Sequence, residues 1–253
     1  MLFRSLVEDM RAVLLPLWNS YQFFASYANI DDFNPSFWKN APPVDKRPRI
    51  DQWILALLKD TEIRVHREME SYELANVFPH LARFLENLTN WYIRLNRSRY
   101  WEAKGESFSS DKLSAYATLF EVLDRFGLIL APYLPFFAEY LNAALHHGLS
   151  AEGLAEHAVQ SVHERLYVIP QTLSTGERAL IDEMAIAQRA ILLGRSLRAE
   201  AKIGLRQPLS RMKLAGLSEL EAHHLRDREE MVLSELNLKE LVFLKDEIGR
   251  AHV

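Results

Sequence analysis

The sequence contains no cysteine among its 253 residues. This absence excludes disulfide bonds, thiol nucleophiles and thiolate metal sites, since each of them needs a cysteine sulfur. The glycines are few and isolated, so there is no glycine-rich loop to hold a phosphate group through backbone amides. A Gly-x-Ser-x-Gly nucleophile elbow is also absent. These classes of catalytic site are therefore excluded.

A long apolar run is missing as well. The most apolar stretch, from Phe126 to Ala138, is interrupted by one glycine and two prolines and is followed by Glu139. It is well short of the roughly 20 residues that a membrane-spanning helix needs. The first residues, Met1-Leu2-Phe3-Arg4, do not open the long apolar core of a signal peptide. We therefore expect a cytoplasmic protein.

Neither charge sign dominates strongly. The 34 acidic and 30 basic side chains give a net charge of −4 at pH 7. A negative chain is not suited to indiscriminate coating of nucleic acid, although a local basic face remains possible. The hydrophobic content of 49% is ample for a sizeable core in one large domain or two smaller ones.

No metal or catalytic site is expected from the ionisable side chains. The histidine pairs His146-His147 and His223-His224 are adjacent in sequence, and adjacent positions of a helix do not face one metal ion. The carboxylates of Glu62, Glu68 and Glu70 have the spacing of a solvated helix face. We therefore expect no cofactor in this chain.

Apolar spacing predicts helices in the first four fifths of the chain. The first covers residues 2–27, where Leu6, Met10, Val13, Leu17 and Phe24 share a face and Pro16 should cause a bend. Others are expected over 51–101 with a weak point at Pro79, over 111–131 up to two prolines, and over 177–202. Asp51 and Asp111 are predicted as N-caps, and loops are expected over 29–49 and 146–175.

The pattern changes after Gly204. Residues 208–215 alternate apolar and polar side chains as a half-buried strand does, residues 218–236 have helical spacing, and residues 238–244 are a second candidate strand. The predicted fold class is mainly α. A helical bundle over residues 1–203 is followed by a small, incomplete β-α-β region over 204–246. Residues 247–253 resemble a translated sequencing adapter and are predicted to be non-native.

Positive charge is concentrated in two clusters. The first contains Arg94, Arg97, Arg99 and Lys104, and its arginines lie within the segment Asn90-Trp91-Tyr92-Ile93-Arg94-Leu95-Asn96-Arg97-Ser98-Arg99-Tyr100-Trp101. Arginine forks bind phosphates and aromatic faces stack on unpaired bases, so this composition suits a single-stranded RNA loop. The alternative is an amphipathic helix end with core aromatics and solvated arginines.

The second cluster is longer. Its members are Arg189, Arg195, Arg198, Lys202, Arg206, Arg211 and Lys213. Arg195, Arg198 and Lys202 are spaced at i, i+3 and i+7, so a helix would place them along one stripe. The alternative is that folding brings acidic partners to these side chains.

The residues of several segments resemble those of one protein family. The segment Asn90 to Trp101 resembles the anticodon-binding domain of isoleucyl-tRNA synthetases, and Arg94 stands where valine and leucine enzymes usually have an acidic residue. Further segments match in the same order: Leu14-Leu15-Pro16-Leu17-Trp18-Asn19, Tyr21-Gln22-Phe23-Phe24, Tyr27-Ala28-Asn29-Ile30-Asp31, Asp51-Gln52-Trp53-Ile54-Leu55, Ala131-Pro132-Tyr133-Leu134-Pro135-Phe136, Ser161-Val162-His163, Leu193-Gly194-Arg195 and Arg206-Gln207-Pro208-Leu209. The resemblance covers nearly all of residues 1–246.

The resemblance implies a tRNA-binding role. In a full enzyme of this family isoleucine is attached to its tRNA with ATP and Mg²⁺, but the ATP-site motifs are absent here. We therefore expect a non-catalytic fragment whose partners are the anticodon stem-loop of isoleucine tRNA and the catalytic and editing domains of the same enzyme. The implied tRNA-binding residues are Arg94, Asn96, Arg97, Arg99, Tyr100 and Trp101, and then Arg195, Arg198, Lys202, Arg206 and Gln207 along the stem.

Within this prediction Tyr100 and Trp101 stack on or pack under splayed bases, while Trp91 belongs to the core because it shares a face with Leu88 and Leu95. Two alternatives remain open. The chain could be a helical protein-interaction module without RNA binding, marked by an exposed apolar patch and internally paired basic clusters. It could also be the same domain from a valyl- or leucyl-type synthetase.

Overall fold

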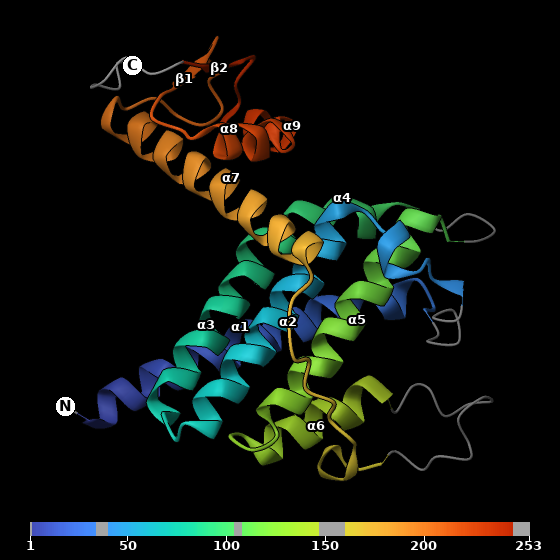
Figure 1. Cartoon of the computed structure of the whole chain (residues 1–253). Coiled ribbons are helices and arrows are strands. Elements are labelled where there is room, and N and C mark those ends of the chain that lie inside the picture. The colour runs from blue at the N-terminus through green and yellow to red at the C-terminus, as the bar shows by residue number, and fades with distance from the viewer. Residues whose placement is uncertain (1, 34–39, 104–107, 147–159, 245–253) are drawn as a thin grey trace. The chain divides into compact units, whose positions relative to one another are not determined.

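A computed structural model describes residues 2–33, 40–103, 108–146 and 160–244, with side chains from Arg11 onward. Its contacts divide the chain into two compact units, Met1–Ser174 and Thr175–Val253. Both units are helical apart from one pair of short strands in the described part of the second unit (Figure 1). The mainly α fold class predicted from the sequence is confirmed.

The first unit is a helical bundle. Its helices are α1 (Leu2–Ile30), α2 (Arg49–Glu70), α3 (Val77–Asn87), α4 (Arg94–Trp101), α5 (Ser110–Leu130) and α6 (Pro135–His146). A π-helical turn, η4 (Leu88–Ile93), joins α3 to α4, and short 3-10 turns occur at η2 (Val44–Lys46), η3 (Leu74–Asn76) and η6 (Val162–Glu164). The predicted tail and Lys104 lie outside the described residues.

Helix α5 is the centre of the first unit. It packs against α1, α2, α4 and α6, and every residue from Lys112 to Phe120 is buried. At its C-terminal half, Phe126 stacks on Phe84 of α3 with ring centroids 5.2 Å apart. Helices α1 and α3 contact each other (Figure 1). The burial of large apolar rings on α5 holds the surrounding helices together.

Prolines and hydroxyls determine the helix ends more than the predicted aspartates do. Pro48 is the N-cap of α2, and the Ser109 hydroxyl caps α5 by accepting the Lys112 amide at 3.1 Å. The predicted N-caps, Asp51 and Asp111, are wrong because both residues lie inside the first turn of their helices. The break expected at the prolines after Leu130 is confirmed, since α6 begins at the second of them.

Two of the carboxylates expected on a solvated face are buried instead. Glu62 is 2% exposed and accepts hydrogen bonds from both Arg125 Nε and Nη2, while Glu68 is 9% exposed and accepts one from Asn76. Burial raises the pKa of Glu62, and its contacts with Arg125 oppose that rise. Sequence spacing missed these residues because their partners come from other elements.

The second unit consists of a long helix followed in the chain by a β-α-β arrangement. It contains α7 (Thr175–Glu200), β1 (Met212–Leu214), α8 (Glu219–Arg226), α9 (Glu229–Leu236) and β2 (Leu241–Phe243). The strands are parallel with Met212 opposite Leu241, as the prediction of a β-α-β region requires. The helix predicted over 218–236 is divided in two, because Arg228 adopts a non-helical conformation. A capping box at Ser218 and Glu221 begins α8.

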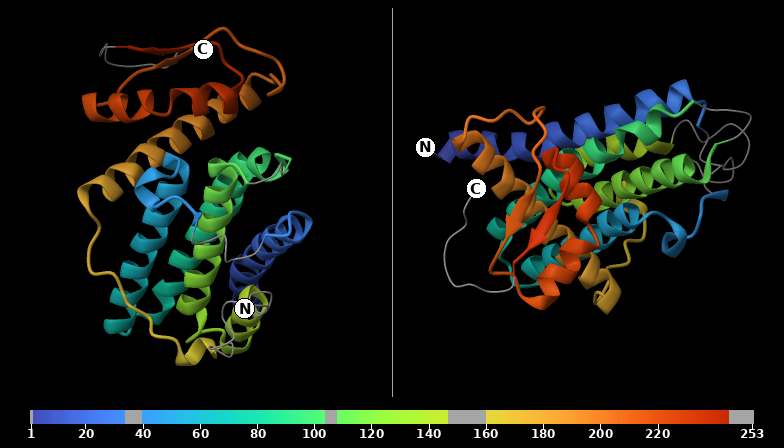
Figure 2. Two further views of the ribbon diagram at one scale, coloured as in Figure 1. Left: turned by 90° about the vertical axis from the view of Figure 1, so that its right-hand side faces the viewer. Right: turned by 90° about the horizontal axis from the view of Figure 1, so that it is seen from above.

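Helix α7 belongs to this second unit. It packs on α8 and α9 (Figures 1 and 2), and Gly194 lies against the side chain of Leu236. The division of the chain after Ser174 therefore lies earlier than the boundary predicted at residue 203. The physical reason is that the buried face of α7 is turned toward α8 and α9, which sequence periodicity could not assign.

Candidate nucleic-acid interface

Arg97 is the most accessible of the three arginines of the first basic cluster, all of which the structure describes. It lies on the outer face of α4, is exposed, and has no ion-pair or hydrogen-bond partner among residues 11–33, 40–103, 108–146 and 160–244. Arg94, one turn earlier, donates its Nε hydrogen to the Asn90 carbonyl at 2.7 Å and lies 5.5 Å from the Trp91 ring. The exposed guanidinium of Arg97 can form two parallel hydrogen bonds with a phosphate.

Arg99 does not share this exposure. Its side chain is 11% exposed and forms a bidentate pair with the fully buried Asp51, with both N–O distances 2.8 Å. Its Nε also donates to Asp111 at 2.9 Å, and Nη1 donates to the Asn96 side chain at 3.0 Å. Burial acts to lower the pKa of Arg99, but the contacts with Asp51 raise it above the ordinary value. Arg99, one of the implied tRNA-binding residues, is thus largely buried and engaged in internal contacts.

Asn96 and Tyr100 are also buried, so neither side chain is accessible to a base. Asn96 is 3% exposed and donates to the Tyr92 carbonyl at 2.7 Å. Tyr100 is 2% exposed, and its hydroxyl donates to the Ala115 carbonyl at 2.9 Å. Both side chains face inward because the same helix face packs on α5. Trp91 is 7% exposed, which confirms its predicted place in the core.

Trp101 is the exposed aromatic side chain at the end of α4. The residue is 61% exposed, and its indole N–H donates to the Tyr27 hydroxyl of α1 at 2.7 Å. This bond holds the edge of the indole while much of the ring faces solvent. Tyr27 was not predicted as part of this site, because its contact with Trp101 spans 74 residues of chain. Exposure and a fixed edge suit the stacking of an unpaired base.

The second basic cluster does not form the predicted stripe. Helix α7 ends at Glu200, and Lys202 follows it in the left-handed region with φ +56°, so Lys202 is not in helical register. Arg195 is paired with Glu235 of α9. Arg198 is 5% exposed and donates to the carbonyls of Leu205 and Gln207. The expectation of one exposed helical stripe is therefore wrong.

Several cations of the second unit nevertheless face solvent. Lys202, Arg206 and Lys213 are exposed, and their side chains have no described partner. Arg211 is exposed with only a long contact of 4.0 Å to Glu240. Arg189 is paired with Glu221 at 2.6 Å. Gln207 is exposed as well. The exposed cations of the second cluster that have no described partner, Lys202, Arg206 and Lys213, thus all come after the end of α7.

Neither a metal-binding cluster nor a membrane-spanning helix occurs in the part of the chain that the structure describes. Among its residues, no group of three or more histidine and carboxylate side chains is placed to hold a metal ion. The same residues contain no helix that is both long and apolar enough to cross a membrane.

Sequence comparison relates the chain to tRNA ligases. Residues 51–213 match the family model described as the anticodon-binding domain of tRNA ligase. The chain is 36% identical over 238 residues to an isoleucine–tRNA ligase of Protochlamydia amoebophila, and this alignment covers 94% of the chain and 21% of the relative. It is 34% identical over 245 residues to that of Porphyromonas gingivalis, covering 96% of the chain and 20% of the relative.

A third relative, the isoleucine–tRNA ligase of Treponema pallidum (strain Nichols), is 33% identical over 251 residues, covering 95% of the chain and 22% of the relative. The chain thus spans about a fifth of the length of the curated relatives that it matches. The resemblance inferred from its motifs is confirmed, and the family model covers more than half of the chain. The chain belongs to the family of anticodon-binding domains of tRNA ligases.

Proposed function

We propose that this chain binds the anticodon stem-loop of isoleucine tRNA, as the tRNA-selecting part of an isoleucine–tRNA ligase. The match of residues 51–213 to anticodon-binding domains is the observation that carries the proposal. Isoleucine is the proposed amino acid because the relatives are named isoleucine–tRNA ligases. In the parent reaction isoleucine is activated with ATP and then transferred to tRNA. This chain contributes recognition of the tRNA and none of that chemistry.

The surface of α4 is suited to this role. Arg97 offers an unpaired guanidinium to a phosphate, and Trp101 offers an indole face to an unpaired base. Both side chains lie on one short helix that Arg99 fixes to α2 through Asp51. The proposal therefore assigns tRNA contact to Arg97 and Trp101, with Arg94 beside them, and a positioning role to Arg99.

The exposed cations argue against the interaction-module alternative. That alternative requires both basic clusters to be paired internally, but Arg97 of the first cluster and Lys202 and Arg206 of the second have no partner in the described part of the chain. In the second unit, Lys202, Arg206 and Gln207 are the positions proposed to contact the tRNA backbone. Arg195 and Arg198 are left out because they serve internal contacts.

Filter binding of isoleucine tRNA over a series of salt concentrations tests the phosphate contact. Each phosphate contact contributes about 0.7–0.9 to the slope of log affinity against log salt concentration. Arg97→Ala should lower the slope by about that amount. The matched control is Arg83→Ala, which removes another exposed arginine of the first unit, on α3. An equal effect of both substitutions would show only a general charge effect and would remove Arg97 from the interface.

A further inference from the structure

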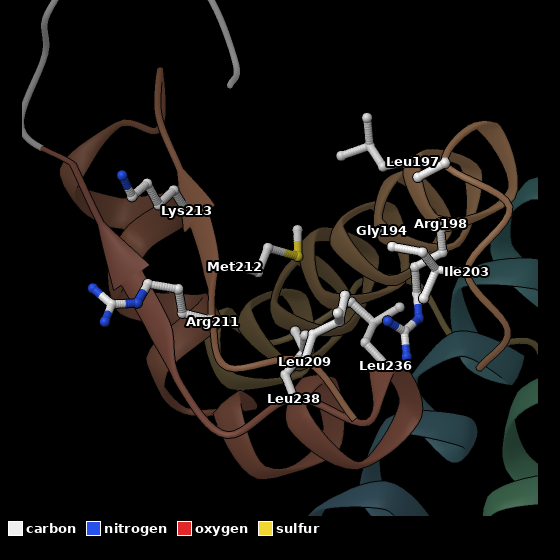
Figure 3. A pocket seen from close by; sticks show the side chains of 11 residues that line it. Gly194, Leu197, Arg198, Ile203, Leu209, Arg211, Met212, Lys213, Leu236 and Leu238 are labelled. Carbon is white, nitrogen blue, oxygen red and sulfur yellow. The ribbon is translucent and has the colours of Figure 1, made fainter. Parts of the chain in front are cut away.

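Unused hydrogen-bond donors occur both in the interior and on the surface of the described chain. Arg198 is an interior case: its Nε and Nη1 are buried without a partner, although the residue helps to line an apolar cavity of about 210 Å³ in the second unit (Figure 3). A ligand in that cavity cannot reach these buried atoms. Tyr27 of the first unit is a surface case, because the hydrogen bond between its hydroxyl and Trp101 is exposed. A donor at this place is accessible to a ligand.

The hydroxyl of Tyr27 retains a hydrogen that it can donate. Its oxygen accepts the indole N–H of Trp101 at 2.7 Å. A phenol hydroxyl is both an acceptor and a donor, whereas an indole nitrogen is a donor only. The hydroxyl hydrogen has no acceptor among residues 11–33, 40–103, 108–146 and 160–244. The pair therefore offers a ligand one hydrogen-bond donor at the edge of one exposed aromatic ring.

Neighbouring rings hold Tyr27 in place. Its ring centroid lies 4.9 Å from that of Phe23 on the same helix and 6.1 Å from that of the buried Tyr100. Phe23 in turn meets Tyr100 edge to face, with the centroids 4.9 Å apart. A side chain that is already ordered loses little conformational freedom when it binds. The hydroxyl is thus positioned before a ligand arrives.

The charges around this hydroxyl favour an uncharged acceptor. The residues from Phe23 to Ile30 carry no charge. Asp31 is 8% exposed and pairs with Lys112 at 2.7 Å. Glu102, the residue after Trp101, is exposed and negative, so it repels a phosphate group. The oxygen and nitrogen acceptors at the edge of a nucleic-acid base carry no net charge and suit this environment.

We propose that Tyr27 donates its hydroxyl hydrogen to the edge of the RNA base that stacks on Trp101; this inference rests on the proposed tRNA binding. Unpaired bases are commonly bound by stacking together with a hydrogen bond to the base edge. Arg97 is four residues before Trp101, so their Cβ atoms lie about 5–6 Å apart on one face of α4. Arg97 binds the phosphate side of the same nucleotide. Tyr27 lies outside residues 51–213, so the family match does not assign it a role.

Filter binding of the anticodon stem-loop RNA of isoleucine tRNA to the whole chain tests the proposal. Tyr27→Phe removes the hydroxyl and keeps the ring, so we expect the affinity to fall about 3–10-fold. Tyr21→Phe is the matched control, because it removes a hydroxyl from the same helix six residues earlier, and it should leave the affinity unchanged. RNA binding that Tyr27→Phe does not weaken would overturn this inference and leave the proposed function standing. Absence of binding by the unmodified chain would overturn both.

Trp101→Phe separates direct contact from mere support of Trp101, because it removes the indole N–H and keeps an aromatic face. In the Trp101→Phe background, Tyr27→Phe should still weaken RNA binding at least about threefold. No further loss would show that Tyr27 acts only by holding Trp101, and would overturn the proposal.

Removal of single bases from the RNA loop identifies the acceptor. At one loop position, an abasic nucleotide should abolish the effects of both Tyr27→Phe and Trp101→Ala, because both side chains are proposed to contact that base. An effect of Tyr27→Phe that persists at every abasic position would place the acceptor on a ribose or a phosphate, and would contradict the proposal.

Discussion

The carboxylate of Asp51 is fully buried and is satisfied from two sides. Arg99 provides both of its Nη groups, and the Tyr92 hydroxyl donates at 2.7 Å. These three side chains join α2, η4 and α4, so they fix the helix that carries Arg97 and Trp101. Burial and the charge of Asp51 both raise the pKa of Tyr92, which keeps its hydroxyl protonated as a donor. The network is a structural support of the proposed interface.

Replacement of Arg99 should destabilise the first unit strongly. Removal of one member of a buried ion pair leaves the other charge uncompensated, so we expect Arg99→Leu to lower the free energy of unfolding by about 3–5 kcal/mol. Arg97→Leu should change it by less than about 0.5 kcal/mol, because Arg97 is exposed. Urea unfolding followed by tryptophan fluorescence measures this unit alone, since all five tryptophans belong to it. Similar unfolding midpoints for the two variants would show that the pair is not structural.

Arginines of one sequence segment therefore have different roles. The composition of residues 90–101 correctly indicated a basic and aromatic segment, but it could not separate Arg97 from Arg99, which are two positions apart. Their difference depends on Asp51, which is 48 residues earlier in the chain. For the same reason Tyr100 and Trp101 could not be distinguished, although one is buried and the other exposed.

At the scale of elements, an ion-pair cluster ties the segment after α6 back to the bundle. Asp124 of α5 accepts hydrogen bonds from Arg165 at 2.7 Å and from His146 at 2.8 Å. Burial acts to raise the pKa of Asp124, and these partners outweigh burial and lower the pKa to about 2. A carboxyl group whose pKa is lower in the folded state stabilises that state once the pH exceeds its unfolded pKa.

The stabilisation by Asp124 should therefore be complete above about pH 4 and lost as the pH falls toward 2. The shift from 3.8 to about 2 corresponds to about 2 kcal/mol. The difference in unfolding free energy between the unmodified chain and Asp124→Asn should shrink by that amount between pH 5 and 2, as measured by urea unfolding. Asp45→Asn, an exposed aspartate of η2, is the control. A difference that stays constant with pH would disprove the coupling.

Close contact between α7 and α9 gives a prediction for the second unit. A Cβ atom at Gly194 would lie 2.4 Å from Leu236 Cδ1, so Gly194→Ala should destabilise this unit by about 1–3 kcal/mol. Leu236→Ala removes the clashing group, and the double variant should be less destabilised than the sum of the single variants. Amide hydrogen exchange along α7 provides the measurement. Additive effects would indicate that Leu236 is not the obstacle.

Element types were more predictable from the sequence than element ends and partners. Apolar spacing located α1, α5 and α7, and alternation located β1, because these patterns report burial of a single face. The second strand was predicted in the correct place without an alternating pattern. The caps at Pro48 and Ser109 were missed, since a proline or serine just before an aspartate competes with it for the same role. The break at Arg228 within the predicted helix 218–236 has no signal in the periodicity.

At the scale of the whole molecule, the motifs carried more information than composition did. A net charge of −4 alone is unfavourable for an RNA-binding protein. The ordered motifs nevertheless indicated the family that the comparison confirms. The division after Ser174 was not predictable, because apolar spacing shows that α7 has a buried face but not which neighbours cover it. The proposed tRNA contacts in each unit remain predictions.

The most direct test of tRNA selection compares isoleucine tRNA with the same tRNA carrying an exchanged anticodon. Equilibrium filter binding at low salt should show tighter binding of the cognate tRNA by the unmodified chain. Trp101→Ala should weaken cognate binding by about 1–3 kcal/mol and reduce the preference, because it removes the stacking surface. Arg83→Ala, which removes an exposed arginine of α3 outside the proposed interface, should keep the preference. Equal affinity for the two tRNAs, or no binding of either, would contradict the account.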